Sequence, residues 1–196
     1  MSTKWISLQM NWIGYYENVV SDDLCDKIMD YSDNVKPLKA SEYATSEGKS
    51  ERSKERVKMD DGWFVNGEQY YQDIRTCFMT ALKKYQEKHK DCVCQRYTDF
   101  RLNKYSEGGF MSRHIDNIHH SHGQTYGYPQ LTALLMLNDN YKGGNLLFYD
   151  PLTMKEIKRY ELKKGTIVFF PSCFLYPHRI EPITEGVRYS IVSWLI

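Results

Sequence analysis

The sequence predicts a mainly β fold: an antiparallel double sheet, or jelly roll, with N-terminal helices packed on one sheet. Three observations support this prediction. Apolar residues recur at helical spacing before residue 93, short alternating runs follow it, and turn-forming residues separate those runs. Many short strands without helices between them are typical of sandwiches and jelly rolls. We therefore expect one domain over residues 1–196, with helical support and a mobile loop over 1–92 and the β core over 93–196.

Two helices are expected in the N-terminal half. Ser21 can cap a first helix at about 21–34, because its hydroxyl can accept a free backbone N–H and two acidic residues follow in the first turn. A second helix is expected at about 68–89, where an apolar stripe lies opposite Lys and Glu. We expect this stripe to cover one face of the sheet. It comprises Tyr71, Ile74, Phe78, Leu82 and Tyr85.

The segment between these helices, residues 36–67, shows no hydrophobic period. Its stretch from Glu47 to Asp61 carries five basic and five acidic residues. Such a composition is most simply that of a solvated, mobile loop. A second hypothesis is a lid that closes over a substrate.

Short strands are expected throughout the C-terminal half. Their residues alternate in character, which places one face of each strand in the core. Gly, Pro, Asn and Asp residues provide turns between them. The expected strands lie at about 95–105, 111–116, 130–137, 144–149, 155–161, 166–170, 174–180 and 187–195.

Composition and charge exclude several classes of partner. Lys and Arg number 26 against 25 acidic residues, so no global field favours nucleic acid or an anionic membrane. No apolar run approaches the roughly 20 residues of a membrane span, and the N-terminus has no signal-peptide core. We therefore expect a soluble, cytoplasmic protein. Five cysteines, an odd count, favour reduced thiols. Cys92 and Cys94 could chelate a soft metal, but packing is the simpler interpretation.

Three side chains predict a metal site. In an extended segment His114 and Asp116 point the same way, because alternate residues share a face. His178 lies between two apolar, strand-like runs that a jelly roll can bring beside the first pair. Two imidazoles and one carboxylate that leave coordination positions open are typical of non-haem Fe(II) oxygenases.

Arg188 and Ser190 repeat this alternation on the last expected strand. Their apolar flanks predict that the guanidinium points into the core. A buried arginine without an anion would be strongly destabilising, and no internal carboxylate is an obvious partner. A dicarboxylate cosubstrate would meet this need, with one end on the metal and the other on the arginine and the serine hydroxyl.

Over residues 95–196 the sequence resembles the Fe(II)/2-oxoglutarate dioxygenase superfamily. More narrowly, it resembles the prolyl 4-hydroxylase-type branch, which includes the PKHD-type bacterial and phage hydroxylases. The motif that carries the resemblance is Tyr105…His114-x-Asp116…Gly143-Gly144-Asn145-Leu146-x-Phe148…Lys164-Gly165-Thr166-x-Val168-x-Phe170-Pro171-Ser172…His178…Arg188-x-Ser190.

The resemblance implies a double-stranded β-helix, a cupin-like jelly roll, that binds Fe(II), 2-oxoglutarate and O₂, with ascorbate as a reductant. By position, the iron ligands would be His114, Asp116 and His178. Arg188 would bind the distal carboxylate of 2-oxoglutarate, assisted by Ser190, and Tyr105 would line the cosubstrate pocket. One position departs from the family pattern. Several prolyl hydroxylases have a second tyrosine before a Leu-Asn pair, where this sequence has Met136.

The implied activity is hydroxylation of a peptidyl residue, with proline the expected target in a protein or peptide substrate. Decarboxylation of 2-oxoglutarate to succinate and CO₂ would accompany it. Two alternatives stay open: a hydroxylase of a free amino acid or small metabolite, and a non-enzymatic, cupin-like metal-binding module. A nucleic-acid demethylase is disfavoured because Trp194 stands where that group has a second arginine.

A histidine cluster follows the first ligand pair. We interpret it as a polar loop at the pocket mouth, and a direct role in binding substrate or metal is the alternative. The cluster comprises His119, His120 and His122.

Overall fold

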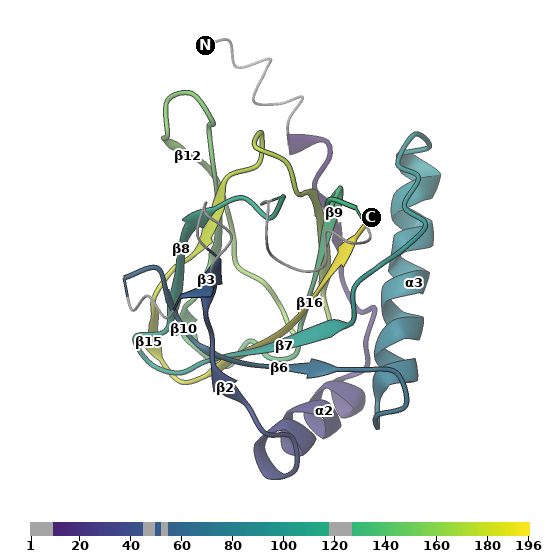
Figure 1. Cartoon of the computed structure of the whole chain (residues 1–196), viewed down its shortest axis with the longest axis vertical. Helices are drawn as coiled ribbons and strands as arrows, with labels where there is room; N and C mark the ends of the chain where they lie inside the picture. The colour runs from purple at the N-terminus through teal and green to yellow at the C-terminus, as the bar shows by residue number, and fades with distance from the viewer. Residues whose placement is uncertain (1–9, 45–49, 52–54, 118–126) are drawn as a thin grey trace.

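Two antiparallel sheets face each other, and two helices lie against the larger sheet, in the computed structural model of the chain (Figure 1). The structure describes residues 10–44, 50–51, 55–117 and 127–196. The prediction of a mainly β, antiparallel architecture with supporting helices is confirmed. In this described part of the chain, no helix is long and apolar enough to cross a membrane.

The larger sheet has seven strands in the order β1-β13-β9-β16-β7-β6-β2, and its central strands come from the C-terminal half. The strands are β1 (Gly14–Tyr16), β2 (Lys39–Ala40), β6 (Asp60–Phe64), β7 (Phe100–Tyr105), β9 (Leu131–Met136), β13 (Ile167–Pro171) and β16 (Arg188–Leu195).

The smaller sheet has five strands in the order β12-β11-β14-β8-β5, and two short ribbons accompany it. Its strands are β5 (Val57–Lys58), β8 (Phe110–His114), β11 (Leu146–Tyr149), β12 (Glu156–Tyr160) and β14 (His178–Ile180). One ribbon pairs β10 (Lys142–Gly143) with β15 (Ile183–Glu185), and the other pairs β3 (Tyr43–Ala44) with β4 (Ser50–Glu51).

Both predicted helices are present. The first is α2 (Asp22–Asn34), where the Ser21 hydroxyl accepts the backbone N–H of Leu24 at 3.3 Å. The second is α3 (Tyr71–Lys88), and all five residues of its predicted stripe are buried. It begins three residues later than expected because Tyr70 has a left-handed backbone, with φ 65°, which a continuing helix cannot contain.

The larger sheet separates two hydrophobic cores. Alternate residues of its strands point to opposite faces. On β16, Ile191 packs among the residues of α2 and α3, whereas Val192 packs between the two sheets. The helices therefore fill one face with apolar side chains, and the other face is left for the space between the sheets.

Part of the segment expected to be a loop is built into both sheets. Asp61 on β6 pairs with Asn103 in the larger sheet, and Val57 on β5 pairs with Met111 in the smaller one. The prediction of a loop over 36–67 is therefore wrong for these strands. Strands of two to five residues with charged side chains on one face carry too short a pattern for a hydrophobic period. Residues 45–49 and 52–54 lie outside the described part.

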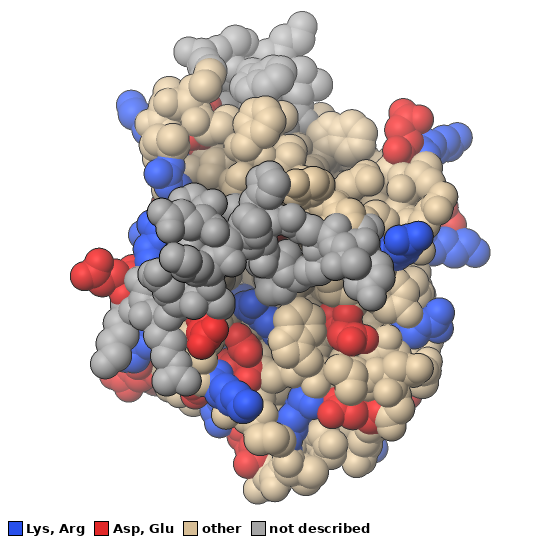
Figure 2. Space-filling view, viewed as in Figure 1, with Lys and Arg blue, Asp and Glu red and all other residues tan. Residues whose placement is uncertain are grey.

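Expected strand boundaries in the C-terminal half differ by a few residues. The strand expected at 95–105 begins at Phe100, and the one expected at 174–180 begins at His178. The short strands β1, β10 and β15 were not expected. On the face drawn in Figure 2, basic and acidic side chains are interspersed, in keeping with the balanced composition.

Phe78→Ala should lower the free energy of unfolding by about 3–5 kcal/mol, because it removes a buried ring that lies 5.0 Å from the ring of Phe100. Urea denaturation followed by circular dichroism measures this loss. The control Lys83→Ala, on the exposed face of α3, should stay within about 0.5 kcal/mol of the parent. Equal losses in the two variants would contradict the placement of α3 on the sheet.

Candidate functional site

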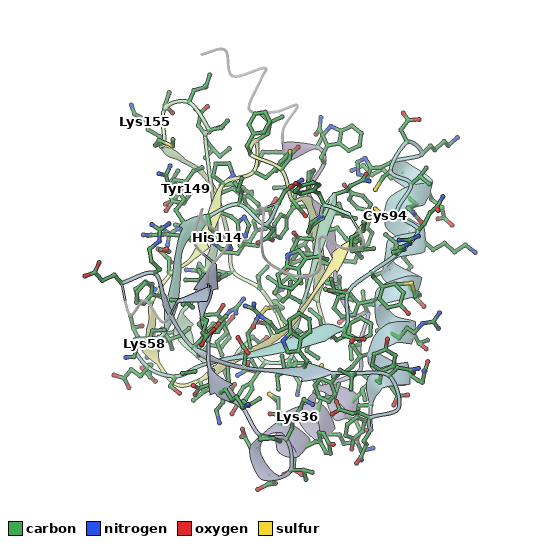
Figure 3. The ribbon with its side chains drawn as sticks, in the orientation of Figure 1. Lys36, Lys58, Cys94, His114, Tyr149 and Lys155 are labelled. Carbon is green, nitrogen blue, oxygen red and sulfur yellow. The ribbon has the colours of Figure 1, made fainter. Side chains whose placement is uncertain are left out.

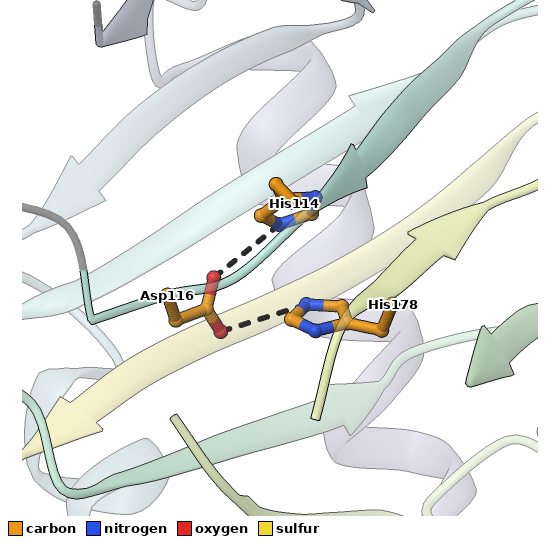
Figure 4. Close-up of side chains that lie close together, drawn as sticks. All are labelled: His114, Asp116 and His178. Carbon is orange, nitrogen blue, oxygen red and sulfur yellow. Dashed lines mark ion pairs between the residues drawn. The ribbon is translucent and has the colours of Figure 1, made fainter. Parts of the chain in front are cut away.

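Three predicted ligands meet in the space between the sheets. His114 ends β8 and His178 begins β14, and the two residues are direct partners in the antiparallel pairing of these strands. Asp116 follows β8 by two residues and lies against both imidazoles (Figure 4). Its two carboxylate oxygens lie 3.3 Å from His114 Nε2 and 3.6 Å from His178 Nε2. One ligand atom from each residue lies within 4.8 Å of the others, a spacing that suits one bound ion.

Backbone carbonyls orient both imidazoles. The Nδ1 atom of His114 lies 2.8 Å from the carbonyl oxygen of Ser112, and that of His178 lies 3.0 Å from that of Tyr176. A carbonyl only accepts hydrogen bonds, so Nδ1 carries the proton in each ring. Both Nε2 atoms are therefore unprotonated, lie beside the Asp116 carboxylate and are available to a metal.

Asp116 is held by a hydroxyl pair that sequence analysis missed. Thr132 donates to the carboxylate with an Oγ1–Oδ2 distance of 2.6 Å, and Ser172 Oγ lies 2.8 Å from the same Thr132 oxygen. Thr132 is the inward-facing polar residue of an otherwise apolar strand, β9. That isolated polar position in an apolar run was the available signal.

The charges of the cluster favour a cation. Burial opposes ionisation of Asp116, but the imidazoles of His178 and His114 and the Thr132 hydroxyl outweigh it, so the pKa of Asp116 lies below its usual value. Burial, together with the nearby His114, lowers the pKa of His178 to about 4. Near neutral pH the Asp116 carboxylate is therefore ionised and His178 is a neutral imidazole, which are the forms that bind metal.

A second predicted group surrounds Arg188 on the same inner face of the larger sheet. Arg188 is fully buried, and its Nη1 donates to Ser190 Oγ at 2.9 Å. Its Nη2 lies 3.3 Å from the sulfur of Met136, and its Cζ lies 5.0 Å from the centroid of the Tyr105 ring. The register explains the grouping, because Arg188 pairs with Tyr105 across β7 while Ser190 pairs with Met136 across β9.

Arg188 lacks an anionic partner among the residues that the structure describes. Its Nε has no hydrogen-bond partner, and its other contacts are a hydroxyl, a thioether and a ring. A thioether is a weak acceptor and cannot balance a buried charge. The arrangement fits a small ligand with a carboxylate at the end that meets Arg188.

The remaining predicted residues lie elsewhere. The sulfur atoms of Cys92 and Cys94 are 3.9 Å apart, and Figure 3 shows Cys94 beside α3 and His114 on the smaller sheet. Within the described ranges, the only group of three or more potential metal ligands is the one formed by His114, Asp116 and His178. His119, His120 and His122 fall outside those ranges.

Residues 100–196 match the 2OG-Fe(II) oxygenase superfamily. Among curated proteins, a PKHD-type hydroxylase from Rippkaea orientalis is 34% identical over 104 residues, which cover 52% of this chain and 44% of that protein. A PKHD-type hydroxylase from Pseudomonas putida is 35% identical over 100 residues, covering 47% and 41% of the two chains. The chain thus spans less than half the length of these relatives.

Solved structures share the fold at low sequence identity. A prolyl-4-hydroxylase of Pseudomonas putida superposes with a TM-score of 0.70 at 16% identity, covering 97% of both chains. A Trichoplax adhaerens prolyl hydroxylase, solved with a peptide fragment of hypoxia inducible factor, gives a TM-score of 0.76 at 17% identity and covers 98% of this chain and 88% of that one. At such identities the likeness shows the fold alone.

Asp116→Asn should weaken Fe(II) binding by more than the roughly 10–100-fold that loss of an outer-shell partner costs, because it removes the one anionic ligand. Thr132→Val, which keeps the ligand and removes its hydrogen bond, should fall within that 10–100-fold range. Anaerobic equilibrium dialysis with metal analysis gives both affinities. Asp91→Asn, at an exposed turn, is the matched control. Unchanged affinity in Asp116→Asn would exclude this cluster as the metal site.

Proposed function

Because residues 100–196 belong to the 2OG-Fe(II) oxygenase superfamily, we propose that this chain is an Fe(II)- and 2-oxoglutarate-dependent dioxygenase that hydroxylates a peptidyl proline. One observation carries the proposal. Among the described residues, the fully buried Arg188 has no anionic partner. It shares the inner face of the larger sheet with Thr132, which donates to Asp116 in the cluster of two histidines and one carboxylate. A structural metal site has no need of that arginine.

The donor set fits Fe(II). The Nε2 atoms of His114 and His178 and the carboxylate of Asp116 would hold the ion, and three protein ligands leave coordination positions open. With 2-oxoglutarate and O₂ bound, the ion would supply the oxidation that converts a substrate C–H bond to C–OH and 2-oxoglutarate to succinate and CO₂.

The Arg188 group would hold the far carboxylate of 2-oxoglutarate. The guanidinium offers a planar fork that matches a carboxylate with two parallel hydrogen bonds. Ser190 would add a hydroxyl donor, and the buried Tyr105 ring would form one wall. Met136 stands where several prolyl hydroxylases have a tyrosine, so a thioether lies against the guanidinium in place of a hydroxyl.

Aromatic packing would keep the site dry and the ligands fixed. The ring of Phe170 lies 4.7 Å from that of His178 in an edge-on contact, and the ring of Phe148 lies 5.9 Å away. Both phenylalanines are buried between the sheets. They would hold His178 in its metal-binding orientation and exclude bulk water from one side of the ion.

We further infer that the facing sheets form the double-stranded β-helix that the sequence predicts, as one domain over residues 1–196. The proline substrate is supported by the PKHD-type relatives and by the fold shared with prolyl hydroxylases. The Trichoplax protein was solved with a bound peptide, which supports a peptide substrate here.

With Fe(II), ascorbate and 2-oxoglutarate, the purified chain should release succinate slowly even without a substrate. Arg188→Lys should raise the KM for 2-oxoglutarate by roughly 10–100-fold, because an ammonium cannot form the two parallel bonds of the guanidinium fork. Arg96→Lys, at an exposed position, should leave this KM unchanged. Absence of succinate from the parent chain would contradict the dioxygenase proposal, and an unchanged KM in Arg188→Lys would contradict the cosubstrate role of Arg188.

Proline-containing peptides should stimulate succinate release and gain one oxygen atom, detected by mass spectrometry. Free amino acids and single-stranded nucleic acid complete the panel. A response confined to free amino acids would replace peptidyl proline with a small-molecule substrate and leave the oxygenase chemistry intact.

A further inference from the structure

A second buried arginine lies on the inner face of the larger sheet and has no role in the chemistry above. Arg101 on β7 is 7% exposed. It shares its face with Asn103 and Tyr105, because alternate residues of a strand point the same way. Sequence analysis missed Arg101, because the other residues on its face of β7, Asn103 and Tyr105, carry no charge that would mark the position.

Arg101 is connected to the candidate metal centre through Trp194 and Thr132. Its Cζ is 5.4 Å from the centroid of the Trp194 ring. Trp194 is the direct strand partner of Thr132, and Thr132 donates to the ligand Asp116. Trp63 pairs with Arg101 across β6 and β7, and its ring lies 6.2 Å from that of Trp194. The cation therefore lies against an aromatic wall that begins beside the metal ligands.

The contacts of Arg101 leave its fork available. Its Nε donates to Asn103 Oδ1 at 2.8 Å, and the nearest carboxylate oxygen, on Asp61, is 4.0 Å from the same Nε, beyond hydrogen-bond length. Neither terminal nitrogen donates a hydrogen bond to a residue that the structure describes. Neither of them is among the fully buried polar atoms that lack a hydrogen-bond partner. Asn103 thus orients the guanidinium, and among the described residues its two terminal nitrogens have no hydrogen-bond partner.

The cosubstrate does not account for this second cation. Arg101 precedes Tyr105 by four positions on β7, and Tyr105 is the strand partner of Arg188. At about 3.4 Å per residue, this separates the backbones of the two arginines by roughly 13 Å along the strands. In the proposed site one end of 2-oxoglutarate meets the metal and the other meets Arg188, so neither carboxylate is left to balance Arg101. The strand partner of Arg101 is Val192, which lies between Arg188 and Trp194 on β16.

We propose that Arg101 binds a carboxylate of the substrate, and that the substrate is therefore acidic near its reacting carbon. This inference rests on the proposed function. The carboxylate can come from an Asp or Glu side chain next to the target residue of a peptide, or from the α-carboxylate of a free amino acid. Both present a planar anion to the guanidinium fork, and the indoles of Trp63 and Trp194 supply apolar contact for the adjacent carbons.

Paired probes test the charge preference directly. Proline-containing peptides that differ only by Glu or Gln on either side of the proline, and L-proline against L-prolinamide, are titrated calorimetrically into the anaerobic chain with Fe(II) and 2-oxoglutarate bound. In at least one pair, the parent chain should bind the acidic member at least about tenfold more tightly than the amide member. The pair that responds identifies the source of the carboxylate.

Arg101→Gln should abolish this preference, and Arg101→Lys should retain part of it, because the charge stays while the fork is lost. With a stimulating probe, Arg101→Gln should raise KM more than it lowers kcat. Arg96→Gln makes the same charge change at an exposed position before β7 and should keep the full preference.

Two results would overturn the proposal: a parent chain that does not distinguish acid from amide in any pair, or an Arg101→Gln variant that still does. Substrate-free succinate release separates this failure from that of the proposed function. It should be present in the parent chain and in Arg96→Gln if the oxygenase assignment holds, whereas its absence from the parent chain would remove that assignment and leave the binding comparison valid.

Discussion

The pairing of β8 with β14 fixes the geometry of the whole site. It sets His114 directly opposite His178 on the inner face, at the point where one strand ends and the other begins. Side chains alternate along a strand, so a slip of one residue would turn Arg113 or Arg179 inward in place of a histidine. A register irregularity next to this pair, between His178 and Ile180, absorbs the mismatch farther along the strands.

The larger sheet meets two opposing demands. The apolar residues of its outer face pack on α2 and α3, which stabilises the fold without burying polar groups that would need partners. Its inner face carries two arginines, a serine and a threonine, whose burial costs free energy unless a partner is present. On β16 the two demands alternate, with Tyr189 and Ile191 toward the helices and Arg188 and Ser190 toward the site. The helical layer thus supports a sheet whose functional face is intrinsically destabilising.

Sequence patterns predicted the elements whose period is long enough to read. The stripe of α3 spans about four turns, and the largely apolar strands β9 and β16 are six and eight residues long. The strands β5, β6 and β15 are too short and too charged to show a period, so tertiary pairing alone defines them. The start of α3 was predicted three residues too early, because the left-handed backbone of Tyr70 cannot be recognised from the hydrophobic pattern.

The candidate site divides in the same way. The convergence of His114, Asp116 and His178 and the burial of Arg188 were predictable, because spacing showed which residues share a face and polar residues in apolar surroundings point to the core. Thr132, Ser172 and Arg101 were not, because their importance depends on contacts between strands that are distant in the sequence.

The two histidines belong to neighbouring strands separated by a large part of the chain, with β9 to β13 between them. Contacts of this kind pay their loop-closure entropy before they return any stability, so such sheets assemble slowly. An ion that requires both imidazoles can be captured only by the completed fold. A higher concentration of free metal would then raise the free energy of unfolding in the cell, because an ion that binds only the native state shifts the folding equilibrium toward it.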